Sequence, residues 1–155
     1  LIDWLPKNLP SEKRTGIVHG DYSLTNVMIG KNDPNVIAIL DWELSTLGDP
    51  CADFNYHCLQ YTMNPKLADK AYCKNQGIPV IDDYVKMYTE KINIDLTEEW
   101  DLYSAYNLFK LAGILQGILG RVRDGTAAHE NAAERASGVR NLSDKAWDLV
   151  KKNFL

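Results

Sequence analysis

A histidine, an aspartate and an asparagine follow one another closely near the start of this 155-residue chain, at His19, Asp21 and Asn26. A second acidic element, with Asp41 and Glu43, comes directly after an apolar run. Carboxylate and amide oxygens are the ligands that a hard cation such as Mg²⁺ prefers. A positioned carboxylate can also take a proton from a hydroxyl group as a general base. The types and order of these side chains therefore indicate a site that combines a base with a metal ion.

The spacing of these residues matches a known catalytic pattern. In protein kinases the base Asp lies two residues after a His, and a magnesium-binding Asn lies five residues after that Asp. His19, Asp21 and Asn26 reproduce both intervals. On this pattern Asp21 would orient an acceptor hydroxyl and accept its proton. Asn26 and Asp41 would hold the metal that bridges the nucleotide phosphates, and Glu43 would hold a second metal or support the first.

The segment 16–45 is predicted to form strand, loop, strand, turn and strand, with the polar side chains at the strand ends. Asp and Gly also simply make turns, so no single residue carries the interpretation. The combination in order is far more specific. We expect His19 to pack and to hydrogen-bond the loop rather than to touch a substrate.

Residues 17–60 resemble the aminoglycoside phosphotransferase and choline kinase superfamily, the small-molecule relatives of protein kinases. Gly20 stands where protein kinases have an arginine, which favours this branch. Residues 39–53 are most similar to phosphotransferase-like domains fused to, or encoded beside, acyl-CoA dehydrogenases. The resemblance implies an enzyme that uses ATP and Mg²⁺ to phosphorylate a hydroxyl of a small metabolite. A hydroxyacyl-CoA is then a more plausible acceptor than an antibiotic.

The catalytic loop departs from that subgroup at two positions. The subgroup often has Arg and Asp where this chain has Ser23 and Thr25. Neither change affects the base or the metal ligands. The missing arginine removes any substrate contact that it makes in relatives, so the identity of the acceptor is not carried over.

The resemblance implies an α+β, mainly helical fold: the C-terminal lobe of a protein-kinase-like protein, with a small β element that carries the catalytic loop. A complete kinase also needs a glycine-rich loop and a strand lysine upstream of that loop. Only 18 residues precede His19, and Lys7 and Lys13 do not lie in a predicted strand. We therefore expect residues 1–155 to form a single lobe without the N-terminal nucleotide lobe, and to be inactive or nearly so alone. That lobe, and a fused or neighbouring acyl-CoA dehydrogenase, are the expected partners.

A helix is predicted from about residue 50 to residue 61. Asp49 and Pro50 form an N-cap followed by a first-turn proline, the favoured start of a helix. Asp53 falls in the first turn, where free amide groups and the helix dipole stabilise a carboxylate. By resemblance it would also reach back and brace the catalytic loop. Both interpretations predict a loss of stability or loop geometry when Asp53 is replaced.

Further helices are predicted over the rest of the chain. Apolar periodicity predicts one at 82–92, and Thr97 is a candidate N-cap for a long helix that ends near Val122. A final amphipathic helix is predicted at 128–151. The helical part, residues 50–155, thus makes up most of the lobe.

Three glycines, Gly113, Gly117 and Gly120, interrupt the apolar part of the long predicted helix. Each lowers helix propensity by about 1 kcal/mol relative to alanine. Close helix packing would explain them, and so would an acceptor groove beside the catalytic loop.

Three cations border this glycine-rich stretch: Lys110, Arg121 and Arg123. They could hold an anionic acceptor, such as a carboxylate or the phosphates of coenzyme A. A general preference for cations at a helix C-terminus explains Arg121 and Arg123 equally well.

Composition excludes several classes of function. The net charge of −4 and the absence of a basic run argue against nucleic acid as a partner. Cys51, Cys58 and Cys73 match neither a zinc site nor a disulfide framework and are expected to be reduced core thiols of an intracellular protein. Within these residues no apolar run is long enough to span a membrane, and we find no signal-peptide pattern; the parent protein could carry a targeting sequence upstream. By resemblance the compartment would be a mitochondrial or peroxisomal matrix.

Two other functions compete with the kinase: a nucleotide-binding pseudokinase and a non-catalytic helical docking module. The chain keeps Asp21, Asn26 and Asp41 together. A pseudoenzyme typically loses at least one such residue, so their retention argues against both alternatives.

Overall fold

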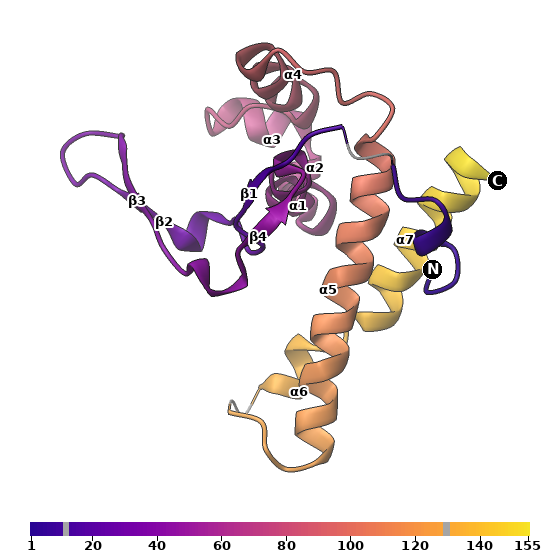
Figure 1. The fold of residues 1–155 in the computed structure, drawn as a ribbon. Helices are drawn as coiled ribbons and strands as arrows, with labels where there is room; N and C mark the ends of the chain where they lie inside the picture. The colour runs from indigo at the N-terminus through magenta and orange to yellow at the C-terminus, as the bar shows by residue number, and fades with distance from the viewer. Residues whose placement is uncertain (11–12, 129–130) are drawn as a thin grey trace. The chain divides into compact units, whose positions relative to one another are not determined.

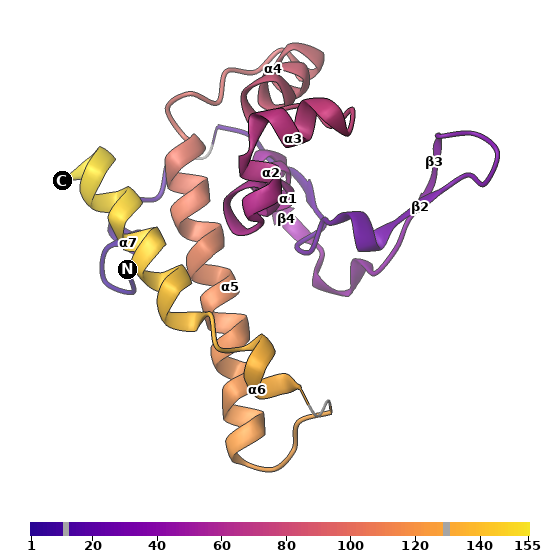
Figure 2. The same cartoon turned by 180° about the vertical axis from the view of Figure 1, so that it is seen from behind.

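The computed structural model describes residues 1–10, 13–128 and 131–155 (Figures 1 and 2). The chain divides into two compact units. One consists of Leu1–Leu9 with Glu99–Leu155, and the other is Pro10–Glu98. The fold is mainly helical with small antiparallel sheets, which confirms the predicted fold class.

The unit Pro10–Glu98 begins with a small β element of two antiparallel strand pairs. Strand β1 (Gly16–Val18) pairs with β4 (Thr46–Gly48), and β2 (Val27–Ile29) pairs with β3 (Val36–Ile39). The connection from β1 to β2 and the connection from β3 to β4 must therefore run side by side. Each contains a short 3₁₀ turn, η2 (Leu24–Asn26) in the first and η3 (Trp42–Leu44) in the second. This topology brings the predicted catalytic loop and the second acidic element together.

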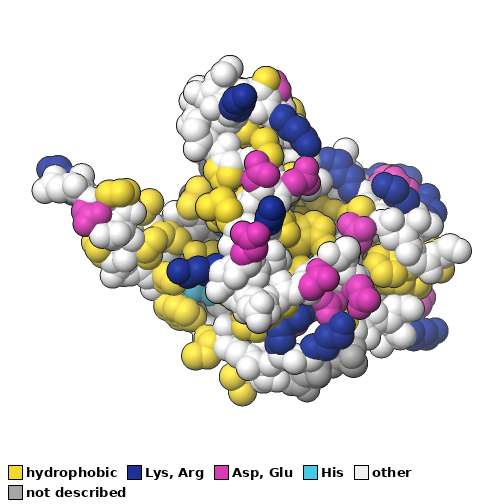
Figure 3. Space-filling view, turned by 90° about the horizontal axis from the view of Figure 1, so that it is seen from above, with side chains coloured by type: hydrophobic (Ala, Val, Ile, Leu, Met, Phe, Trp, Pro, Cys, Tyr) yellow, Lys and Arg dark blue, Asp and Glu magenta, His cyan; other side chains and the backbone are white. Residues whose placement is uncertain are grey.

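Large apolar side chains are exposed on this β element. On β2 and β3 they are Met28, Ile29, Val36 and Ile37. The space-filling view shows hydrophobic side chains along the hairpin that these strands form, at the left of Figure 3. A contiguous apolar surface of this kind commonly marks a contact with another part of the protein or with a partner.

Four helices complete this unit: α1 (Pro50–Met63), α2 (Pro65–Ala68), α3 (Lys70–Asn75) and α4 (Ile81–Ile92). Helix α1 starts as predicted, because the Asp49 carboxylate accepts a hydrogen bond of 2.9 Å from the Cys51 amide and Pro50 occupies the first turn. The same carboxylate forms an ion pair of 2.9 Å with Arg14. The start of α1 is thereby tied to the segment that leads into β1.

The core of this unit lies along one face of α1. Cys51, Phe54, Cys58 and Leu59 are buried there. The Phe54 ring stacks on Tyr88 of α4 with a centroid distance of 3.7 Å. The three cysteines of the chain are free and buried, as the sequence predicted.

The other unit consists of the 3₁₀ turn η1 (Leu5–Lys7) and the helices α5 (Trp100–Arg123), α6 (Ala132–Arg135) and α7 (Val139–Phe154). Helices α5 and α7 lie side by side in both ribbon views. Their buried residues recur at helical spacing, namely Leu102, Ala105, Leu108 and Ala112 on α5 and Leu142, Ala146 and Val150 on α7. None of the described helices is both long and apolar enough to cross a membrane.

Two predicted helix boundaries are wrong. Thr97 does not cap the long helix, which begins at Trp100; its amide and hydroxyl instead donate to Asp95 Oδ1 at 2.9 and 2.6 Å. The single helix predicted at 128–151 is interrupted between α6 and α7, where Ser137 and Gly138 have weak helix propensity. Residues 129 and 130 of that predicted helix lie outside the described residues.

Close packing does not explain the glycines of α5. Within the part of the chain that the structure describes, a Cβ atom added at Gly113 or Gly120 would have no neighbour within 4 Å. At Gly117 the one neighbour would be the Arg121 guanidinium, at 4.0 Å. The expectation of tight helix packing here is therefore wrong for the described contacts.

Replacing Gly113 by alanine should stabilise the chain. The new methyl group would meet open space, and alanine favours the helix over glycine by about 1 kcal/mol. Urea unfolding should show a rise of that order in the free energy of unfolding. As a contrast, Gly20→Ala should destabilise, because Gly20 has φ +87° and its Cβ would lie 2.5 Å from the Leu44 carbonyl oxygen. A loss of stability in Gly113→Ala would contradict the open surroundings of this position.

Candidate active site

The backbone of Leu40 joins the two connections that carry the predicted site. Its amide donates to the Asn26 carbonyl oxygen at 2.8 Å, and its carbonyl oxygen accepts from His19 Nε2 at 2.7 Å. Asp41 is the next residue in the chain. The structure therefore brings the turn with Asp41 against both ends of the loop from His19 to Asn26.

His19 holds the loop from inside. Its side chain is only 3% exposed, and its Nδ1 accepts a hydrogen bond of 3.2 Å from the Asp21 amide. A neutral imidazole that accepts at Nδ1 carries its proton on Nε2, which matches the contact with Leu40. The ring also lies 4.7 Å from the Trp42 ring, centroid to centroid. Both ring nitrogens are thus engaged by the backbone, which supports a structural role for His19.

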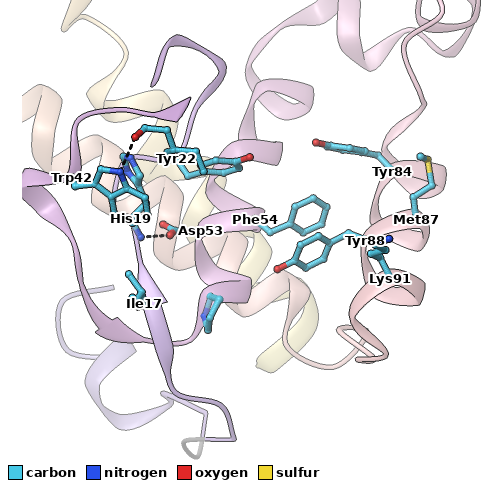
Figure 4. Close-up of a pocket in the computed structure, with 12 residues that line it drawn as sticks. Ile17, His19, Tyr22, Trp42, Asp53, Phe54, Tyr84, Met87, Tyr88 and Lys91 are labelled. Atoms are coloured by element: carbon cyan, nitrogen blue, oxygen red, sulfur yellow. Dashed lines mark hydrogen bonds between the residues drawn. The ribbon is translucent and has the colours of Figure 1, made fainter. Parts of the chain in front are cut away.

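Asp53 braces the same loop from α1. Its two carboxylate oxygens accept hydrogen bonds from the amides of His19 and Gly20, the latter at 3.0 Å. Figure 4 shows Asp53 directed at the backbone of His19. Capping of α1 is carried out by Asp49, so the contacts of Asp53 favour the bracing interpretation over simple capping.

Asn26 and Tyr56 hold the predicted base. Asn26 Nδ2 donates to the Asp21 carbonyl oxygen at 2.9 Å and to Asp21 Oδ2 at 3.2 Å. The Tyr56 hydroxyl of α1 also hydrogen-bonds the Asp21 side chain. Burial, together with the nearby negative charge and this hydrogen bond, raises the pKa of Tyr56 to about 12. Tyr56 therefore stays a neutral donor at any physiological pH.

Tyr56 was not identified from the sequence. It lies three residues after Asp53, and residues at this spacing share one face of a helix. Once Asp53 is assigned to the loop, the same face of α1 is the place to look for further contacts with it. The three-residue spacing between Asp53 and Tyr56 was therefore the feature of the sequence that could have identified Tyr56.

The donors expected to hold a metal suit Mg²⁺. Asn26 uses its NH₂ group on Asp21, which leaves its Oδ1 available to a cation. Asp41 is exposed, and no described residue hydrogen-bonds its carboxylate. Its backbone is left-handed, with φ 66° and ψ 57°, a conformation that is uncommon for residues other than glycine and is found at functional sites.

Glu43 lies exposed on η3, two residues after Asp41. Within the described residues, no group of three or more His, Cys, Asp or Glu side chains is arranged to hold a metal ion. Asn26, Asp41 and Glu43 as metal ligands remain a prediction.

The cations predicted to hold an acceptor belong to the other unit. Lys110, Arg121 and Arg123 all lie on α5. Arg123 is exposed and pairs with Asp124 at 3.0 Å, and the Arg121 carbonyl oxygen accepts from the Thr126 amide at 2.9 Å. These contacts belong to the end of α5, and the role of the three cations in acceptor binding also remains a prediction.

Comparison with known proteins shows the family to which the chain belongs. The model of the phosphotransferase enzyme family matches residues 1–106. The chain is 38% identical over 157 residues to acyl-CoA dehydrogenase family member 10 of Mus musculus and 33% identical over 159 residues to member 11 of Homo sapiens. A crystal structure provisionally described as an aminoglycoside phosphotransferase of Ralstonia eutropha superposes with a TM-score of 0.88 at 40% identity. The chain therefore belongs to the phosphotransferase enzyme family, and the resemblance seen in the sequence is confirmed.

The chain is much shorter than the proteins that it matches. Of its own length, 98% and 99% align with the two acyl-CoA dehydrogenase family members, but it spans only 15% and 20% of theirs. The structural match to the Ralstonia eutropha protein includes 99% of this chain but only 48% of the solved chain. In these relatives the phosphotransferase-like domain is part of a larger protein.

Replacing Asp53 by asparagine should destabilise the unit that holds the loop. An amide offers one acceptor where the carboxylate offers two, so one of the two loop amides loses its partner. Loss of a buried charge-assisted hydrogen bond typically lowers the free energy of unfolding by about 1.5–3 kcal/mol.

The matched control is Asp83→Asn, an exposed carboxylate in the first turn of α4. This variant removes a comparable interaction with a helix dipole without touching the loop. Equal unfolding free energies for the two variants, measured by urea titration, would show that Asp53 does no more than stabilise its own helix.

Proposed function

We propose that this chain carries the catalytic loop of a kinase that transfers the γ-phosphoryl group of ATP to a hydroxyl of a small metabolite. The observation that carries the proposal is that hydrogen bonds hold the Asp21 side chain in one position. Its side chain is held by Asn26 and Tyr56 within a loop whose backbone is fixed by Asp53. Such fixed geometry is what a general base requires.

In the proposed reaction Asp21 accepts a hydrogen bond from the acceptor hydroxyl and takes its proton as the oxygen attacks. Asn26 and Asp41 would hold Mg²⁺ through an amide and a carboxylate oxygen. The ion would neutralise the charge that builds on the phosphate oxygens. His19 and Asp53 keep the loop in place and do not contact the reacting atoms.

The rest of the nucleotide site would come from a second lobe of the same protein. A glycine-rich loop and a strand lysine are needed to hold the phosphates, and we propose that this chain alone is inactive or nearly so. The exposed apolar side chains of β2 and β3, such as Ile29 and Val36, supply a surface against which such a lobe could pack. The matched relatives support an association with an acyl-CoA dehydrogenase, and with it a hydroxylated acyl compound as the acceptor, either a hydroxyacyl-CoA or a free hydroxy acid.

The test is transfer of labelled γ-phosphate by the full-length protein in the presence of Mg²⁺. Acceptors would be hydroxy acids, hydroxyacyl-CoAs, choline and aminoglycosides. Wild type should label one class, and Asp21→Asn should lower the rate about 10²- to 10⁴-fold, the usual contribution of a positioned base.

A matched control is Asp33→Asn, an exposed acid in the turn between β2 and β3, which should keep full activity. Nucleotide binding that depends on Mg²⁺, without transfer to any acceptor, would instead indicate a pseudokinase. No nucleotide binding at all would indicate a docking module.

Removing the Tyr56 hydroxyl should impair the base without unfolding the chain. Tyr56→Phe keeps the ring but deletes one donor to Asp21. Hydrogen bonds to charged groups are worth about 1.5–3 kcal/mol, so kcat should fall roughly 10- to 100-fold while KM for ATP stays the same. Tyr106→Phe, at an exposed tyrosine of α5, is the control. If kcat is unchanged in Tyr56→Phe, Asp21 does not depend on this contact.

A further inference from the structure

A cavity of about 450 Å³ opens beside the catalytic loop, within the unit Pro10–Glu98 (Figure 4). One wall comes from β1 and η3, with Ile17 and Trp42. The opposite wall comes from α4, with Met87 and Tyr88, and Phe54 of α1 lies between them. Its volume falls within the range of about 300–1,000 Å³ that is usual for small-molecule sites.

The cavity reaches the catalytic loop close to the predicted base. Tyr22, the residue after Asp21, and His19, two residues before it, both contribute to the lining, whereas Asp21 itself does not. The Tyr22 ring lies 5.5 Å from that of His57, and His57 Nε2 shares a hydrogen bond of 3.2 Å with the Tyr84 hydroxyl. Burial lowers the pKa of His57, so this imidazole is neutral at pH 7. Two aromatic side chains of the lining, Tyr22 and Tyr84, are thus both held by contacts with His57, which does not itself line the cavity.

The walls are apolar, and part of their surface is open to solvent. Ile17 is 68% exposed, Met87 60% and Trp42 44%. The stacked pair of Phe54 and Tyr88, with ring planes 11° apart, forms a rigid part of the lining. Open apolar side chains around a concave surface gain stability when a hydrocarbon group displaces water from them.

The charged side chain that remains available to a ligand at this cavity is a lysine, Lys91. Lys91 lies one turn after Met87 on α4 and lines the cavity, and within the described residues it forms no ion pair. Asp53 also contributes to the lining, but its carboxylate is engaged by the amides of His19 and Gly20. By contrast, Lys86 of the same helix pairs with Glu90 at 3.8 Å and does not line the cavity.

We propose that this cavity binds the hydrocarbon part of an organic carboxylate, whose anionic group meets Lys91, and that such a molecule is the phosphoryl acceptor. The second half of the proposal rests on the proposed kinase function, whereas the binding itself does not. A polycationic sugar would place its charges against apolar walls and beside a lysine, so the cavity disfavours an aminoglycoside.

The experiment measures binding to the full-length protein by calorimetry, with octanoate as the probe and without nucleotide. Octanoate has no hydroxyl group to phosphorylate, so its binding is independent of catalysis. Butyrate lacks four methylene groups and should bind at least tenfold more weakly. Octylamine has a similar chain with the opposite charge and should also bind at least tenfold more weakly.

Two variants locate the site. Met87→Asp places a charge on the apolar wall at an exposed position, and Lys91→Ala removes the cation; each should weaken octanoate binding about tenfold. Lys86→Ala, on the same helix but outside the cavity, should bind octanoate as wild type does. The proposal is overturned if octanoate binds no better than butyrate, or if the Lys91 and Met87 variants bind it like the Lys86 variant.

The binding experiment and the phosphoryl-transfer experiment can fail independently of each other. Octanoate binding that depends on Lys91, in a protein that transfers no phosphate, would retain the binding site and reject its role in catalysis. Phosphoryl transfer to an acceptor without octanoate binding would retain the kinase and reject this cavity as the acceptor site.

Discussion

The geometry of the site depends on two chain connections that run side by side. Because β1 pairs with β4 and β2 pairs with β3, the loop after β1 and the turn after β3 cannot separate. Leu40 then fixes their relative position through its backbone alone, with its amide on Asn26 and its carbonyl oxygen on His19. The proposed base on one connection and the proposed metal ligand on the other can therefore be brought together without any direct bond between their side chains.

Helix α1 supplies the second constraint. Asp49 caps its first turn, Asp53 accepts two amides of the loop, and Tyr56 reaches the Asp21 side chain. The buried face of the helix also carries Phe54, which packs on α4. One helix thus couples the core of the unit to the position of Asp21, the proposed base, so a change in core packing should alter the geometry of the loop.

The sequence was sufficient for contacts between residues that lie close together in the chain. The intervals between His19, Asp21 and Asn26 predicted one loop, in which the structure joins these residues by hydrogen bonds, and the order Asp49, Pro50 predicted the start of α1. It failed at Thr97, where a residue type that commonly caps a helix instead serves a turn with Asp95. Local preference could not separate these two uses, because both satisfy the same hydroxyl group.

The cavity could not be predicted in the same way, because its lining comes from segments as far apart as Ile17 and Lys91. Its aromatic residues on α1 and α4, namely Phe54, Tyr84 and Tyr88, fit helices that need an apolar face, so the sequence gives no sign that they line an open cavity. The concave surface forms only where α4 and α1 meet the β element, with Ile17 and Trp42 on one side and Tyr88 on the other. The proposed catalytic loop is set by local spacing, whereas the apolar surface beside it depends on contacts between distant segments. If Asp21 is the base and the cavity holds the acceptor, the chemistry and the choice of acceptor can vary independently, so two chains with the same loop need not share a substrate.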